Sequence, residues 1–203
     1  MADQRIDIIE IKSKQYFRNS MTQATTTCER CKADTTSRPH DDPRTSYPAI
    51  GTVIHGTMRS QDLLPAWLDV VKTHHPAEYS RIMADIPADA FDNDDHCFWT
   101  DEDSGVFECS WILNEDLFDV LNNLAPPWTY FGSHEGDGSD YGFWPSWDAI
   151  SDAVNDKEIL EVGDLSEVPD NYTGEVFIVN DHGNATIGFM REGGKFDECW
   201  AVV

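Results

Sequence analysis

The amino-acid sequence predicts an α+β fold in which a C-terminal antiparallel β-meander packs with three to four helices, preceded by a flexible N-terminal segment. Apolar residues recur with helical spacing in the middle of the chain, whereas short β-branched runs alternate with Gly and Asn turns from residue 175 onward. Hydrophobic residues make up 40% of the chain and include seven Trp. This content is sufficient for a packed core.

Two regions are expected. Residues 1–50 are interpreted as a flexible extension, because residues 20–48 are polar and lack periodicity, although isoleucines near the start suit a strand or short helix. Residues 51–203 are expected to form an acidic α+β domain. The chain has no apolar run of about 18 residues and no apolar signal core, so we expect a cytoplasmic protein without membrane contact.

The first part of the domain reads as a strand followed by two helices. Gly51–Thr57 carries β-branched residues between glycines and is expected to be a strand. A helix capped by Ser60 or Asp62 should run to the histidines at 74–75, with Pro65 in its first turn. Pro76 should then begin a second, short helix. The apolar stripe of the longer helix comprises Leu63, Leu64, Trp67, Leu68 and Val71.

Two further helices are expected in the second half. One lies within Phe107–Leu124, where Asn114 is the expected cap. The other spans Trp147–Val154, capped by Ser146, with Trp147, Ile150 and Val154 facing inward. The C-terminal meander should comprise three strands, at Glu175–Val179, Ala185–Met190 and Phe196–Val203.

Residues 130–144 form a stretch in which two aromatic pairs flank a segment rich in Gly and acids. The flanks are expected to be short strands around a loop whose glycines, at 132, 136, 138 and 142, allow positive φ. The loop either is a solvated turn or gathers polar side chains around a hard cation. The candidate residues of that loop are His134, Glu135, Asp137 and Asp140.

Charge is the strongest global feature of the sequence. The formal net charge is −24. Residues 1–50 hold eight basic and seven acidic side chains, whereas residues 51–203 hold six basic and 31 acidic side chains. Between Arg81 and Lys157 there are 18 acidic side chains and no Lys or Arg. Such a field repels nucleic acid and membrane surfaces and attracts basic proteins. Solubility or adaptation to high salt is the alternative explanation.

Acidic residues are densest between positions 85 and 103, where Pro87 and Asn93 interrupt any helix. The pattern does not match a calcium-binding loop. Carboxylates at this density require either solvation or a cationic partner. The expected partner-binding residues are Asp92, Asp94, Asp95, Asp101, Glu102 and Asp103, with Phe98 and Trp99 as stacking or apolar anchors.

The cysteine pattern offers one weak cofactor candidate. Cys28 and Cys31 have the spacing of half a zinc site, but no second pair follows them, and a plain polar turn is the simpler interpretation. Five cysteines without a signal core suggest free thiols in a reducing compartment. No other cofactor is expected.

Three segments carry a resemblance that covers residues 51–203. They are Gly56–Pro65, Phe131–Trp144 and Val179–Thr186. With these segments the chain resembles a group of uncharacterised small acidic proteins encoded by bacteriophages, plasmids and bacteria. The resemblance implies a mobile-element setting in a bacterial host cell and carries over no catalytic residues. By analogy of charge and setting, the chain looks like the nucleic-acid mimics that block restriction or CRISPR complexes.

Three functions remain open from the sequence. The first is a non-enzymatic inhibitor whose carboxylates imitate DNA phosphates in the basic channel of a defence complex, without binding nucleic acid itself. The second is a small metal-dependent enzyme that uses residues 132–142, although no recognised catalytic motif is present. The third is an acidic interaction module of general type.

Overall fold

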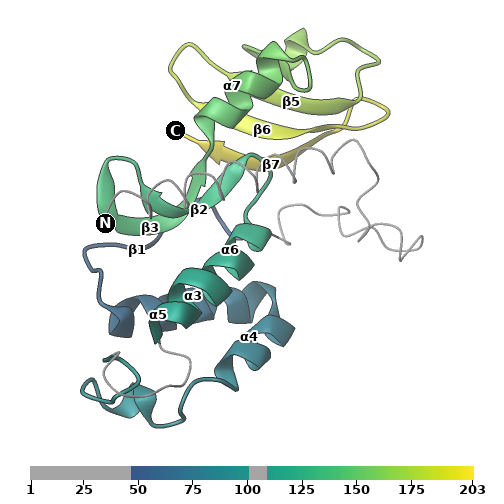
Figure 1. The fold of residues 1–203 in the computed structure, drawn as a ribbon. Coiled ribbons are helices and arrows are strands. Elements are labelled where there is room, and N and C mark those ends of the chain that lie inside the picture. Colours follow the sequence, from purple (N-terminus) through teal and green to yellow (C-terminus); the bar gives the residue numbers. More distant parts are fainter. Residues whose placement is uncertain (1–46, 101–108) are drawn as a thin grey trace. The chain divides into compact units, whose positions relative to one another are not determined.

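The computed structural model describes residues 47–100 and 109–203, all of which lie in one compact unit. The predicted α+β class is confirmed (Figure 1). The expected extension lies outside the described residues except for positions 47–50. Of these, Pro48 is buried and Ile50 packs against two core clusters, so the folded part begins before residue 51.

A three-stranded antiparallel sheet is built from β1 (Gly51–Ile54), β2 (Thr129–His134) and β3 (Asp137–Pro145), in the order β1-β3-β2. β2 and β3 form the hairpin expected around residues 130–144, with Phe131 opposite Phe143. Its connection is shorter than expected, because pairing continues to His134 and Asp137. β1 ends before residue 57, and Gly56 follows with φ of 77°.

The expectation of positive φ at the hairpin glycines is wrong, since none of the four has it. Most of the presumed loop is extended strand instead. One of these glycines is required for a different reason. A Cβ built on Gly142 would collide with the carbonyl oxygen of Gly51 on the neighbouring strand. Gly138, in contrast, has open space around the equivalent position.

The first helix of the described residues, α3 (Ser60–His74), buries the whole predicted stripe from Leu63 to Val71. Neither Ser60 nor Asp62 caps it. Arg59 occupies the cap position, and Thr57 accepts a hydrogen bond from the Arg59 N–H and donates one of 2.6 Å to Asp62. Because the helix begins at Ser60, Pro65 lies beyond the first turn, contrary to expectation.

The expected short helix is present as α4 (Pro76–Met83). His75 joins the two helices. Its backbone N–H donates to the Val71 carbonyl, and its Nδ1 accepts from the Glu78 N–H. The histidine thus ends one helix and caps the next.

A continuous helical segment follows, made of α5 (Cys109–Trp111), a π-helical stretch (Ile112–Leu117) and α6 (Phe118–Leu124). Asn114 is not its cap. It lies inside the segment, and its side-chain amide donates to the Ser110 carbonyl at 2.7 Å. The prediction placed the start too late because Asn114 followed by two acids imitates a helix N-terminus.

The C-terminal sheet contains the predicted meander and one further strand. β5 (Gly174–Val179), β6 (Ala185–Met190) and β7 (Phe196–Val202) pair antiparallel in chain order. β4 (Leu160–Val162) adds in parallel to β5 and was not predicted. A short 3₁₀ helix at Leu165–Glu167 lies between β4 and β5.

Helix α7 (Trp147–Asn155) packs on this sheet (Figure 1). Its buried residues are Ile150 and Ala153, which share a core cluster with Ile187 and Trp200. The inward orientation expected for Trp147 is wrong, since 46% of this residue is exposed. Ser146 occupies the cap position without a side-chain hydrogen bond.

The C-terminal sheet is joined to the rest of the domain through residues 126–128. The Trp200 indole N–H donates to the Pro127 carbonyl at 2.7 Å, and the Trp128 indole N–H donates to Glu175 Oε2 at 3.0 Å. Trp128 adopts a positive φ of 63°. Burial raises the pKa of Glu175, with the Trp128 hydrogen bond opposing this effect and nearby Glu158 adding to it.

The glycine contact gives a test of the first sheet. Gly142→Ala should destabilise the domain by about 1–3 kcal/mol, because the strands must separate to admit a methyl group. Gly138→Ala is the matched control and should leave stability unchanged or slightly higher. Urea unfolding measures both; equal stability of the two variants would contradict this account.

Glu175 gives a pH-dependent prediction. A raised pKa means that folding favours the protonated carboxyl, so its unfavourable contribution is absent below the unfolded pKa and grows as pH rises through the folded pKa. Glu175→Gln keeps an oxygen for the Trp128 N–H and removes the charge. The stability of the variant relative to the parent should therefore increase as pH rises above the ordinary carboxyl pKa of 4.5 and level off above the raised pKa of Glu175, as measured by thermal unfolding. A difference independent of pH would be inconsistent with a buried titrating carboxyl.

Candidate functional site

The acidic segment of residues 85–95 is anchored to the helical core by apolar side chains. Ile86 and Ala90 are buried inside the segment, and Phe98 is buried just after it. The five aspartates of the segment, which lie before and between these anchors, are exposed. They are Asp85, Asp89, Asp92, Asp94 and Asp95. The alternation fixes where the backbone runs and leaves the carboxylates in solvent.

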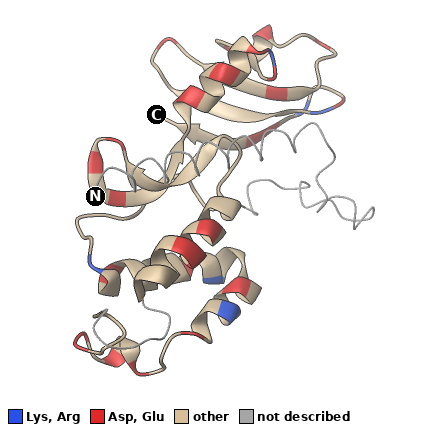
Figure 2. Cartoon of the chain, viewed as in Figure 1, with Lys and Arg blue, Asp and Glu red and all other residues tan. Residues whose placement is uncertain are grey.

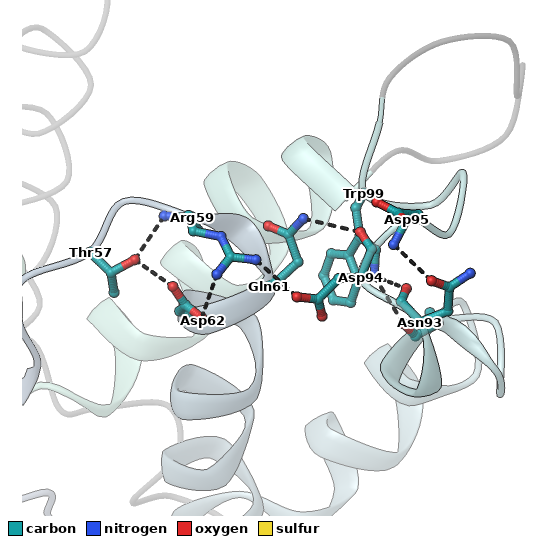
Figure 3. Close-up of polar contacts among 9 residues, drawn as sticks. Thr57, Arg59, Gln61, Asp62, Asn93, Asp94, Asp95 and Trp99 are labelled. Carbon is teal, nitrogen blue, oxygen red and sulfur yellow. Dashed lines mark hydrogen bonds and ion pairs between the residues drawn. The ribbon is translucent and has the colours of Figure 1, made fainter.

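Local hydrogen bonds give this segment a defined shape. Residues Ala90–Asp92 form one turn of 3₁₀ helix. The Trp99 indole N–H reaches back to the carbonyls of Ala90, at 2.9 Å, and Asn93, at 3.2 Å. Asn93 Oδ1 accepts from the Asp95 N–H at 2.9 Å (Figure 3). The segment is therefore a folded turn, where the sequence indicated only an interruption of helix.

The structure changes the choice of aromatic anchor. The expectation that Phe98 offers a surface anchor is wrong, because only 6% of it is exposed and it belongs to the core. Trp99 is half-buried and its N–H is already used. Phe91 is the aromatic residue that the segment exposes, at 41%, with its ring 5.9 Å from that of Trp99. The sequence did not indicate Phe91, because the residues next to Phe91, Phe98 and Trp99 do not show which of these three aromatic side chains is exposed.

The remaining predicted partner-binding residues, Asp101, Glu102 and Asp103, lie outside the described residues. So do Cys28 and Cys31 of the zinc candidate. The acidic surface considered below is therefore defined by the five exposed aspartates of residues 85–95 together with Phe91.

One end of the segment is held by the start of α3. Arg59 lies between two carboxylates, 3.0 Å from Asp94 and 3.8 Å from Asp62 (Figure 3). The Gln61 side-chain amide adds a longer contact of 3.4 Å to the Asp94 carbonyl. Arg59 thus neutralises part of the charge on Asp94 while positioning the turn.

His96 holds the other side of the segment. Its Nδ1 accepts from the Phe98 N–H at 3.1 Å, which leaves Nε2 directed at Asp89, 3.4 Å away. Asp85, Asp92 and Asp95, by contrast, have no side-chain hydrogen bond or ion pair with the described part of the chain. Three carboxylates of the acidic surface are therefore left to solvent or to a partner.

Most basic side chains of the domain are used internally. Besides Arg59, Arg81 pairs with Glu78 at 2.7 Å and Asp116 at 3.3 Å, and the Glu78 hydrogen bond raises the pKa of the Arg81 guanidinium. Lys72 lies 5.5 Å from the centre of the Tyr79 ring. Figure 2 shows acidic positions spread over helices and loops and basic ones at only a few places.

The remaining paired cations lie at the turn between β6 and β7. Arg191 and Lys195 each approach a different oxygen of Asp197 at 2.7 Å. Their hydrogen bonds, led by that of Lys195, lower the pKa of Asp197. Within the described residues, five of the six Lys and Arg side chains after residue 50 are thus matched to a carboxylate or a ring.

The four hairpin candidates do not converge on one point. His134 packs on Trp144, with ring centres 4.7 Å apart, and accepts from the Gly136 N–H. Glu135 is exposed at the turn. Asp137 accepts from both the N–H and the hydroxyl of Ser139, which lowers its pKa. Asp140 instead accepts from Thr52 on β1 at 3.2 Å.

The contacts of His134 and Asp137 lie within the hairpin, and that of Asp140 joins the hairpin to β1. Across residues 47–100 and 109–203, no three His, Cys, Asp or Glu side chains come together in a way that could hold a metal ion. The cation site considered from the sequence is therefore not formed by these four residues as they stand.

Comparisons with known proteins give no relatives: no family model, curated protein or solved structure matches the chain. Within the described ranges, none of the helices combines the length and apolar character needed to cross a membrane.

The two phenylalanines make the anchoring of the acidic surface testable. Phe98→Ala should cost about 3–5 kcal/mol of stability, because it empties a core position. Phe91→Ala should cost about 1 kcal/mol or less, because 41% of this residue is exposed and it is not part of the buried core. Chemical denaturation distinguishes them, and a similar loss for both would mean that Phe91 also belongs to the core.

Proposed function

We propose that this chain is a non-enzymatic inhibitor that imitates nucleic acid and occupies the basic DNA channel of a bacterial defence complex, of the CRISPR or restriction type. The observation that carries the proposal is the acidic surface. Its carboxylates stand on a turn anchored by buried side chains, and three of them have no partner in the described chain. An imitation of phosphates requires charges held in place before the partner arrives.

The electrostatics of the domain favour a cationic partner. DNA-binding proteins obtain most of their non-specific affinity from Lys and Arg contacts to phosphates. Carboxylates on a folded surface can take the same positions. Arg59 offsets part of the charge on Asp94, but Arg81, Arg191 and Lys195 pair with carboxylates outside the acidic surface and leave its remaining charge in place. The same field disfavours direct binding of nucleic acid by this chain.

Phe91 adds an apolar element to this surface. It lies between buried Ala90 and exposed Asp92 and presents part of its ring to solvent. Aromatic residues at the centre of an interface contribute strongly once water is excluded around them. We therefore place Phe91, in the role first assigned to Phe98, at the centre of the proposed interface.

The resemblance to small acidic proteins of bacteriophages, plasmids and bacteria supplies the proposed setting, a bacterial host cell under attack by a mobile element. The alternative of a metal-dependent enzyme lacks comparable support, because the hairpin side chains are engaged in separate local contacts. A general interaction module differs in one respect: for it, the positions of the acids would not matter.

The test compares two triple charge reversals with the same net change. The first variant alters the acidic surface by changing three aspartates to Lys: Asp85, Asp92 and Asp95. The second alters exposed positions elsewhere in the domain by changing three other aspartates to Lys: Asp152, Asp156 and Asp170. Each reversal involves exposed carboxylates, so the fold should be retained in both. The assay measures DNA binding by a purified CRISPR effector complex and by a purified restriction complex. The concentration of the parent or variant chain and the salt concentration are each increased in turn.

The parent protein should inhibit DNA binding by at least one complex, in competition with DNA, and the inhibition should weaken as salt screens exposed charges. Reversal in the acidic surface should reduce the inhibition at least roughly a hundredfold, and reversal elsewhere by less than about tenfold. Equal loss in the two variants would support the general module instead. Failure of the parent to inhibit either complex, or binding alongside DNA, contradicts the proposal.

A further inference from the structure

A second surface lies between the edge of the first sheet and α3. An open groove of about 410 Å³ runs there, lined in part by Phe143 and by the polar residues Thr52, Asp69 and His74. Ala49 and Val53 line one wall, and Ala66 and Val70 of α3 line the other. This volume falls within the range of sites that bind ligands or side chains. The groove is distinct from the acidic surface and does not depend on the proposed function.

The strand beside this groove has an unpaired edge. β1 is terminal in the order β1-β3-β2, so within the described residues no strand pairs with it on the side away from β3. An edge strand presents a row of N–H and C=O groups that can pair with another extended chain. Strand addition uses such an edge for affinity and an adjacent apolar pocket for alternate side chains.

The negative charge at the groove favours a positively charged partner segment. Asp69 lines it from α3, is exposed, and makes no side-chain hydrogen bond or ion pair with the described chain. A second copy of this chain would bring a further net charge of −24 to the contact. A cationic segment would instead be attracted and could pair with Asp69 at the rim.

We propose that the groove between β1 and α3 binds an extended segment of a partner protein by strand addition to β1. In this segment an aliphatic side chain contacts the apolar part of the groove, and a Lys or Arg two residues away, on the same face of the strand, reaches Asp69. The backbone pairing supplies much of the affinity, and the two side chains set the specificity.

The probe is a capped Lys-Val-Lys-Lys-Lys-Val peptide, in which the second, fourth and sixth side chains share one face of the extended chain, so that two Val and one Lys face the groove together. In an extended chain the N–H groups of alternate residues point to opposite edges. Two N-methylated versions form a matched pair: methylation at the second, fourth and sixth residues blocks one edge, and methylation at the first, third and fifth blocks the other. Calorimetry on the full chain measures affinity, and amide NMR shifts locate the bound peptide.

Strand addition predicts that one methylated peptide binds at least roughly tenfold more weakly than the other, a difference of about 1.4 kcal/mol. The NMR shifts should fall on β1 and α3. Equal affinity of the two methylated peptides, or shifts centred on residues 85–95, would overturn the proposal, since both indicate attraction by charge alone.

Two variants test the groove itself. Ala49 is exposed at the groove, so the larger side chain of Ala49→Trp should fill the groove and abolish binding of the unmethylated peptide. Asp69→Lys should weaken binding more than Asp92→Lys, which makes the same charge change on the acidic surface. Equal effects of the two reversals contradict a role for Asp69. A dimer in sedimentation that Ala49→Trp dissociates would show that a second copy occupies the groove, which also excludes the proposal.

Discussion

The helical part of the domain depends on the packing of aromatic side chains around the ring of Phe131. Its neighbours come from three elements: Trp67 of α3 at 5.0 Å, Phe118 of α6 at 5.8 Å and Phe143 of β3 at 5.1 Å between ring centres. Edge-to-face and tilted packing of this kind adds to the gain from burial. Phe131 is 1% exposed, so these helices and the hairpin share one apolar centre. The acidic segment is anchored to the same core through Ile86, Ala90 and Phe98.

Periodicity was sufficient to predict the elements whose contacts are local. The stripe of α3 and the three strands of the meander follow from spacing and turn residues, and both agree with the structure. β4 was missed because its three residues pair in parallel with a strand more than ten positions away, which leaves no local pattern. Asn114 was misassigned because a π-helical stretch continues the helix through a plausible cap.

In the candidate site, too, features set by local sequence could be predicted, whereas features set by distant contacts could not. The density of acids around residue 90 was evident in the sequence, and the structure places the five described aspartates on one exposed turn. Which aromatic side chain joins them was not evident. Phe98 and Phe91 differ in burial because of contacts with distant helices and not because of their neighbours in sequence. The hairpin glycines likewise depend on a partner strand, since Gly142 is constrained by Gly51.

The matching of basic side chains to nearby carboxylates has a thermodynamic consequence. Carboxylates without such a partner must be neutralised by a diffuse layer of cations from solution. A basic surface that approaches Asp85, Asp92 and Asp95 displaces those ions into the bulk, where they regain translational entropy. Association at this turn would accordingly be driven largely by entropy, with only a small heat of binding.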